Sequence, residues 1–188
     1  MQHLPDWKKI TSFPAGLTTS AGRRLDALVW EHSPTLLVFL RHTGCTFCRE
    51  MLADLQAAYP KIQAKGIQVI LVHMSDANRM RKILHNTPLS EIEQVSDPDC
   101  VLYKCFGLRK GSLAQLFGPA VWRRGWEAGV CQRHGVGWLD GDGFQLPGIF
   151  GLRNGRVNAA FIHRHAGDRP DYHEISEQLL ARNNETVP

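Results

Sequence analysis

Residues 35–72 have the sequence TLLVFLRHTGCTFCREMLADLQAAYPKIQAKGIQVILV, and this stretch decides the fold. The run 35–40 is continuously apolar with β-branched and aromatic members, which is typical of a strand buried on both faces. Apolar residues then recur at helical spacing until Pro60, which is expected to stop the helix. After a turn at Gly66, residues 67–72 repeat the buried-strand pattern. The order strand, helix, strand predicts a right-handed βαβ unit with parallel strands.

The second half of the chain predicts an antiparallel ribbon and a closing helix. Two strand-like runs, 148–152 and 156–162, are separated by Asn154-Gly155, the dipeptide that most readily adopts a type I′ hairpin turn. Asp171 and Glu174 form a capping-box-like pair at the start of an amphipathic helix. Between the two halves we expect short helices at 76–84 and 99–106, a broken helix or two turns within 111–130, and a loop at 135–143. This order predicts an α/β fold with a mixed β-sheet and helices on both faces, the thioredoxin-like arrangement.

The composition fits one globular domain. The chain has 188 residues, of which 43% are hydrophobic and 21% charged, close to average globular usage. We therefore expect one domain over residues 1–188, with an insertion around 109–143. The net charge of +4 is spread along the chain and gives no support for nucleic-acid binding. No segment approaches the roughly 18 consecutive apolar residues that cross a bilayer, so we expect no membrane contact and a cytoplasmic protein.

The feature that carries chemistry is Cys-Thr-Phe-Cys, in which Cys45 and Cys48 follow a predicted buried strand and open a predicted helix. Unpaired backbone N–H groups and aligned peptide dipoles at a helix N-terminus favour the thiolate, the nucleophilic form of cysteine. Arg41, His42 and Arg49 lie nearby in sequence and add positive potential. We assign Cys45 the attacking role and Cys48 the resolving role, because one helical turn brings the second thiol within reach of the first.

Other interpretations of these residues stay open at this point. Cys-x-x-Cys is also a zinc-ligand spacing, and the two thiols are alternatively buried and inert. His42 either tunes the Cys45 thiolate or caps the end of the strand. A different resolving thiol or a regulatory disulfide would come from the remaining cysteines, which are Cys100, Cys105 and Cys131. Three tryptophans of the insertion pack in a core, line a hydrophobic substrate groove or form a dimer face: Trp122, Trp126 and Trp138.

A second constellation is Gln145-Leu146-Pro147-Gly148, which leads into the predicted strand 148–152. Proline is allowed at the start of a strand because that position need not donate to the ladder. In a redox fold Pro147 is either an ordinary trans residue or a cis residue that brings the preceding backbone against the dithiol. In the cis case we expect the backbone groups of Leu146 to be free to pair with a substrate chain.

Four segments together resemble the AhpC/TSA-type peroxiredoxin-like proteins, and more closely the branch related to selenoprotein L and the prostamide/prostaglandin F synthases. The segments are LTTSAGRRL (17–25), FLRHTGCTFCRE (39–50), SDPDCVLYKCFGLRKGSLAQLFGP (96–119) and FQLPGIFGLRNGRVNAAFIHRHAGDRPDY (144–172). The resemblance implies a thioredoxin fold in which Cys45 and Cys48 are the redox pair. It also implies that Pro147 is the proline that faces this pair.

The sequence departs from the peroxiredoxins proper, which place Pro-x-x-x-Thr-x-x-Cys before the peroxide-attacking thiol. Counting back from Cys48 gives Arg41 and Cys45 at the proline and threonine positions. Counting back from Cys45 gives Val38 and His42, so neither cysteine has the pattern. Efficient peroxide reduction therefore does not follow from the resemblance, and the substrate stays open between peroxides and disulfides.

Taken together, these features predict a peroxiredoxin-like thiol oxidoreductase with an antioxidant role. Cys45 attacks an S–S or O–O bond in a small peroxide or a protein disulfide, and Cys48 closes an intramolecular disulfide. A thioredoxin- or glutathione-type reductant restores the dithiol, and a homodimer is left open. We expect no metal or organic cofactor, because the sulfur pair carries two electrons itself. The alternative function is a redox-sensing or interaction module that keeps the fold and turns over nothing.

Overall fold

The computed structural model describes residues 13–14, 16–32, 34–44, 46–112, 141–165 and 167–181. Its elements, in chain order, are α1 (Leu25–Glu31), β1 (Thr35–Phe39), α2 (Thr46–Ala64), β2 (Gln68–His73), α3 (Ala77–Leu84), β3 (Glu93–Ser96), α4 (Val101–Cys105), β4 (Gly148–Arg153), β5 (Arg156–Ile162) and α7 (Tyr172–Ala181). The predicted βαβ unit is confirmed as β1, α2 and β2, with β1 and β2 parallel. The short helices expected at 76–84 and 99–106 are confirmed as α3 and α4.

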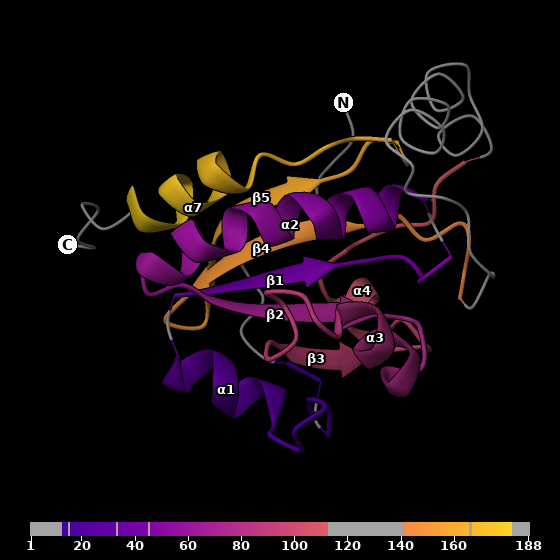
Figure 1. The fold of residues 1–188 in the computed structure, drawn as a ribbon, viewed down its shortest axis with the longest axis horizontal. Helices are drawn as coiled ribbons and strands as arrows, with labels where there is room; N and C mark the ends of the chain where they lie inside the picture. The colour runs from indigo at the N-terminus through magenta and orange to yellow at the C-terminus, as the bar shows by residue number, and fades with distance from the viewer. Residues whose placement is uncertain are drawn as a thin grey trace.

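The strands form one mixed sheet in the order β3-β2-β1-β4-β5 (Figure 1). β3, β2 and β1 are parallel to one another, whereas β4 and β5 run antiparallel to their neighbours. The register pairs Phe39, the last residue of β1, with Gly148, the first residue of β4. The carboxyl end of β1, the start of β4 and the end of β5 therefore meet at one edge of the sheet, the same edge at which α2 begins (Figure 1).

β1 lies in the middle of the sheet and divides its residues between two cores. Leu36 and Val38 pack on the face covered by α2, α3 and α7. Leu37 and Phe39 pack on the opposite face, against α1 and α4. Successive side chains of a strand point to opposite faces, so a continuously apolar strand needs cover on both sides. The predicted mixed sheet with helices on both faces is thereby confirmed.

The prediction that Pro60 stops the long helix is wrong. α2 continues to Ala64 with Pro60 inside it. Proline removes one backbone hydrogen bond, and the last turn keeps its place because Ile62, 2% exposed, packs into the core beneath it. Burial of that apolar side chain outweighs the local preference against proline.

Two elements were not predicted from the sequence. The edge strand β3 has the sequence EQVS, which is too short and too polar to show a strand pattern. It forms because its backbone pairs with β2. Helix α1 does carry a periodic signal in the sequence, since its buried residues Leu25, Leu28 and Val29 recur at helical spacing.

The hairpin between β4 and β5 turns at Asn154-Gly155, as predicted. Asn154 has φ +50° and Gly155 φ +70°, the positive values that a type I′ turn requires at both central residues. The indole of Trp30 from α1 lies against this turn: a Cβ added at Gly155 would be 2.3 Å from Trp30 Cζ2. Glycine is therefore required there for backbone conformation and for space.

Replacing Gly155 by alanine is expected to lower the free energy of unfolding by about 1–3 kcal/mol, through left-handed strain and the overlap with Trp30. Gly66→Ala is the matched control, because Gly66 also has φ +70° and nothing lies within 4 Å of its added Cβ. Urea unfolding of both variants, alone and combined with Trp30→Ala, separates the backbone strain from the overlap with Trp30. Equal losses in the two alanine variants would show that Trp30 does not constrain the turn.

Asp171 caps the start of the closing helix α7, as predicted, whereas Glu174 Oε1, the other member of the predicted pair, accepts from Gln178 Nε2 at 3.0 Å. Asp171 Oδ1 accepts hydrogen bonds from the backbone N–H groups of His173 and Glu174, at 2.8 and 3.0 Å. These contacts lower the pKa of Asp171, because they favour the charged carboxylate.

Several predicted features lie outside the described residues: the broken helix within 111–130 beyond position 112, most of the insertion, Cys45, Cys131 and the three insertion tryptophans. None of the helices that the structure describes is both long and apolar enough to pass through a bilayer.

Candidate redox site

Cys48 lies in the first turn of α2 and its side chain is 2% exposed. Its Sγ accepts a hydrogen bond from the backbone N–H of Arg41, 3.2 Å away. The N–H comes from the carboxyl end of β1, so the strand and the helix meet at this sulfur. A hydrogen bond to sulfur favours the thiolate over the thiol. Cys45 stands in sequence directly before α2, at a position outside the described residues.

Three basic residues lie near the cysteine pair in the sequence, and each has different contacts in the structure. The Arg41 guanidinium donates to the Gly143 carbonyl, and it is the Arg41 main chain that contacts the sulfur. Arg49 Nε donates to the Thr43 carbonyl at 3.2 Å, which lays the Arg49 side chain along the segment before α2. His42 is buried, and its Cβ would be 3.2 Å from a Cβ added at Gly141. The structure thus places the 141–143 segment beside the end of β1.

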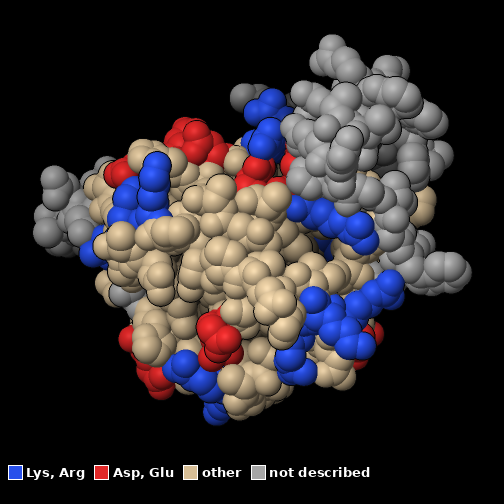
Figure 2. Space-filling view, in the orientation of Figure 1, with Lys and Arg blue, Asp and Glu red and all other residues tan. Residues whose placement is uncertain are grey.

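Basic side chains also gather at this end of the visible face. α3 has the sequence ANRMRKIL, which contains three basic residues and no acidic one. Figure 2 shows Lys and Arg on the right of the visible face, where α3 and the start of α2 lie in Figure 1. A positive potential at this end favours an anionic sulfur.

Pro147 directly precedes β4 at the same edge of the sheet, and its carbonyl accepts a hydrogen bond from the His163 N–H at 3.4 Å. The backbone groups of Leu146, which we expect to be free for a substrate chain in the cis case, are both hydrogen-bonded within the chain in this structure. The Leu146 N–H donates to the Arg109 carbonyl, and the Leu146 carbonyl accepts from Gln145 Nε2, both at 3.2 Å. These groups are already used within the chain because the segment before β4 pairs with the segment after α4.

Most of the chain matches one known protein family. The family model described as AhpC/TSA family matches residues 8–134, more than half of the chain. The chain belongs to the AhpC/TSA family. This family is peroxiredoxin-like with a thioredoxin fold, so membership supports thiol-based redox chemistry.

Curated relatives agree with this assignment. Peroxiredoxin-like 2A of Rattus norvegicus is 28% identical over 158 residues, which cover 80% of this chain and 65% of that protein. Thioredoxin-like protein AAED1, chloroplastic, of Arabidopsis thaliana is 22% identical over 166 residues, covering 81% of this chain and 64% of that protein. The chain therefore spans somewhat less than two thirds of the length of these relatives.

Solved structures show the fold. Reduced Prx3 from Vibrio vulnificus superposes with a TM-score of 0.61 at 15% identity, covering 87% of this chain and 92% of that one. A secreted Mycobacterium tuberculosis disulfide oxidoreductase superposes with a TM-score of 0.51 at 13% identity, covering 88% and 93%. The thioredoxin-like α/β fold of this AhpC/TSA-family protein is thereby established.

Two buried phenols flank Cys48 in this AhpC/TSA-family protein, and sequence reasoning missed both. Burial, followed by the charge of Cys48, raises the pKa of Tyr103 well above its usual value. Burial also raises the pKa of Tyr172, with Asp54 and then Cys48 adding to the effect. Both phenols therefore stay protonated, and both donate to backbone carbonyls. A tyrosine within an apolar helical pattern gives no sign in sequence that its hydroxyl lies near Cys48.

The other described cysteines lie on the opposite side of the sheet from α2. Cys100 Sγ is 3.4 Å from Met74 Sδ, and both residues belong to the core beneath α1 and α4. Burial, then the charges of Asp97 and Asp142, raise the pKa of Cys100. Burial alone raises the pKa of Cys105. A raised pKa leaves less thiolate at neutral pH, so these two thiols are poor nucleophiles.

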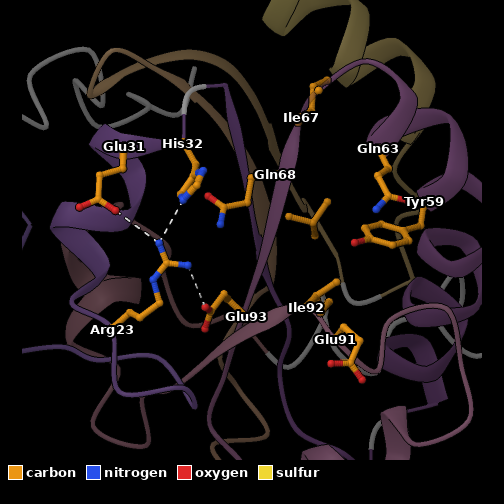
Figure 3. Close-up of a pocket in the computed structure, with 12 residues that line it drawn as sticks. Arg23, Glu31, His32, Tyr59, Gln63, Ile67, Gln68, Glu91, Ile92 and Glu93 are labelled. Atoms are coloured by element: carbon orange, nitrogen blue, oxygen red, sulfur yellow. Dashed lines mark hydrogen bonds and ion pairs between the residues drawn. The ribbon is translucent and has the colours of Figure 1, made fainter.

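A surface pocket of about 500 Å³ lies at the other end of the sheet (Figure 3). The Arg23 guanidinium points toward Glu31, His32 and Glu93 there, at 3.3, 3.0 and 3.4 Å (Figure 3). Gln68, the first residue of β2, also lines it. Because α2 begins at the carboxyl ends of β1 and β2, this pocket is remote from Cys48 and does not belong to the redox site.

Proposed function

We propose that this chain is a thiol oxidoreductase in which Cys45 attacks an S–S or O–O bond and Cys48 closes an intramolecular disulfide. The observation that carries the proposal is the placement of Cys48, with its Sγ 3.2 Å from the Arg41 N–H in the first turn of α2. The sequence puts the second thiol three residues earlier. Membership in the AhpC/TSA family supports the same chemistry.

The burial of Cys48 supports the division of roles between the two thiols. A sulfur that is 2% exposed cannot meet a protein disulfide first, whereas it is well placed for a second, intramolecular step. The thiols of Cys100 and Cys105 are poor substitutes, because burial raises the pKa of each and both pack on the far side of the sheet. Cys48 is therefore our resolving residue.

The steps balance for either substrate. With a disulfide, the Cys45 thiolate bonds to one sulfur and expels the other as a thiolate; Cys48 then attacks the Cys45 sulfur and releases the second thiolate. With a hydroperoxide, Cys45 takes up the terminal oxygen as a sulfenic acid and releases the alcohol, and condensation with Cys48 releases water. Both routes end in a Cys45–Cys48 disulfide, which is reduced by one thioredoxin-type dithiol or by two glutathione-type monothiols that leave joined as a disulfide. Two electrons pass through sulfur, so the cycle needs no metal or organic cofactor.

Mass spectrometry after limited oxidation tests this assignment. The reduced protein is treated with one equivalent of hydroperoxide, or of a small disulfide, and a sulfenic-acid trap is added. We expect the transient adduct on Cys45 and the stable bridge between Cys45 and Cys48. A bridge to Cys100, Cys105 or Cys131 in the monomer would contradict the proposal. Comparing the rates of the two oxidations then identifies the preferred substrate class.

A further inference from the structure

We propose that Tyr103 is a positioning residue for the Cys48 sulfur, acting through the peptide group that joins Leu40 to Arg41. This inference rests on the proposed function, in which Cys48 is a reacting thiol. The Tyr103 hydroxyl donates to the Leu40 carbonyl oxygen. The Arg41 N–H donates to Cys48 Sγ. That carbonyl and that N–H are the two ends of one planar peptide group, so a single rigid unit connects the phenol to the sulfur.

The effect of this connection follows from peptide resonance. A hydrogen bond to the carbonyl oxygen draws electron density from the nitrogen and makes the N–H at the other end a stronger donor. A stronger donor stabilises an anionic acceptor more than a neutral one. The Tyr103 hydroxyl therefore favours the Cys48 thiolate over the thiol, without touching the sulfur.

The phenol is held firmly in the place that this role requires. The Tyr103 side chain is 0% exposed and its ring packs edge-on against Phe39, with centroids 5.1 Å apart. Its hydroxyl also lies 3.2 Å from the Val72 carbonyl, which accepts the Leu40 N–H at 2.8 Å. The hydroxyl thus lies where the ends of β1 and β2 meet. Burial keeps it protonated and able to donate.

The helix that carries Tyr103 is anchored by a buried carboxylate. Asp97 Oδ1 accepts from the Val101 N–H and Oδ2 from the Leu102 N–H, each at 2.8 Å. Asp97 is itself 2% exposed and its own N–H donates to the His73 carbonyl at the end of β2. α4 has only five residues, so these contacts set its position. Tyr103 therefore cannot move away from the Leu40 carbonyl without disturbing the sheet edge.

The test is a titration of Cys48 in the reduced protein, using the chemical shift of cysteine labelled with ¹³C at Cβ, assigned by Cys48→Ser. In Tyr103→Phe we expect the midpoint to rise by about half a pH unit, a roughly threefold smaller thiolate-to-thiol ratio. Tyr172→Phe is the matched control. It removes another buried hydroxyl near Cys48, one that donates to the Met51 carbonyl at 3.2 Å and not to the Leu40–Arg41 peptide.

An equal rise in both variants would overturn the inference, because the effect would then be general to buried hydroxyls. An unchanged midpoint in folded Tyr103→Phe would overturn it as well. If that variant does not fold, 3-fluorotyrosine at position 103 gives the opposite sign: its hydroxyl is a stronger donor, and the midpoint should fall. The titration needs no turnover, so it can be measured and interpreted even if the chain reduces no substrate. Conversely, loss of turnover on mutation of Cys45 with no effect at Tyr103 would leave the proposed function intact and this inference wrong.

Discussion

Replacing Cys45 by serine is expected to abolish turnover, with a loss of roughly a thousandfold or more in the rate of reductant oxidation with peroxide or disulfide. A serine hydroxyl is not ionised at neutral pH and forms no disulfide, so the first bond exchange cannot occur. The measurement is consumption of a thioredoxin-type reductant by the purified protein, with a hydroperoxide and with a model disulfide in separate assays.

Cys48→Ser should fail at a different step. Cys45 would still attack, so one equivalent of leaving group should appear in a burst, followed by accumulation of a mixed disulfide or sulfenic acid on Cys45. Intact-mass measurement shows the adduct directly. This single-turnover behaviour is what distinguishes a resolving thiol from an attacking one.

Cys105→Ser is the matched control for both variants. It makes the same chemical change at a half-buried thiol on α4 whose pKa burial raises, and it should keep turnover within about twofold of the unmodified protein. Retained turnover in Cys45→Ser would overturn the proposed mechanism. Absence of turnover in the unmodified protein with every reductant and substrate would instead favour a redox-sensing module.

Lowering the pH from 7 to 4 is expected to remove about 3 kcal/mol of folding stability through His163 alone. This residue is 2% exposed, and both of its ring nitrogens are buried away from solvent. Its ring packs edge-on against Phe161, with centroids 5.0 Å apart. Burial lowers the pKa of His163 from 6.5 to about 4, and the nearby Asp168 only partly opposes this.

The sign follows from where the proton binds. Between pH 6.5 and pH 4 the unfolded chain binds a proton at His163 that the folded chain excludes. Stability therefore falls as the pH falls through this window, and the His163 contribution is constant below about pH 4. Above pH 6.5 the residue is neutral in both states and has no such effect.

Urea unfolding at a series of pH values checks this prediction on the unmodified protein and on His163→Leu. The difference in the free energy of unfolding between the unmodified protein and His163→Leu should change by about 3 kcal/mol from pH 7 to pH 4. The effects of other titratable groups cancel in this difference. His165→Gln is the control, since His165 Nε2 pairs with Asp168 Oδ1 at 2.9 Å in the same loop. Parallel curves for the unmodified protein and His163→Leu would contradict the prediction, because they would show that His163 binds its proton equally well in the folded and unfolded chain.

Much of the fold could be predicted from the sequence because its signals are local. The apolar run of β1 predicts a strand covered on both faces, and the Asn154-Gly155 dipeptide predicts the hairpin turn. β3 could not be predicted, because a polar strand of four residues owes its conformation to pairing with β2. Pro60 gave a strong local signal that burial of Ile62 overrode.

The same division holds for the candidate site. The Cys-x-x-Cys spacing and its position between a buried strand and a helix can be read from the sequence, since both are properties of a short segment. Only the tertiary structure decided that a backbone N–H reaches Cys48, and that a phenol 63 residues from Leu40 holds the same peptide. Such contacts depend on strand register and helix packing, which bring together segments that are far apart in the sequence. Local periodicity carries no information about these contacts.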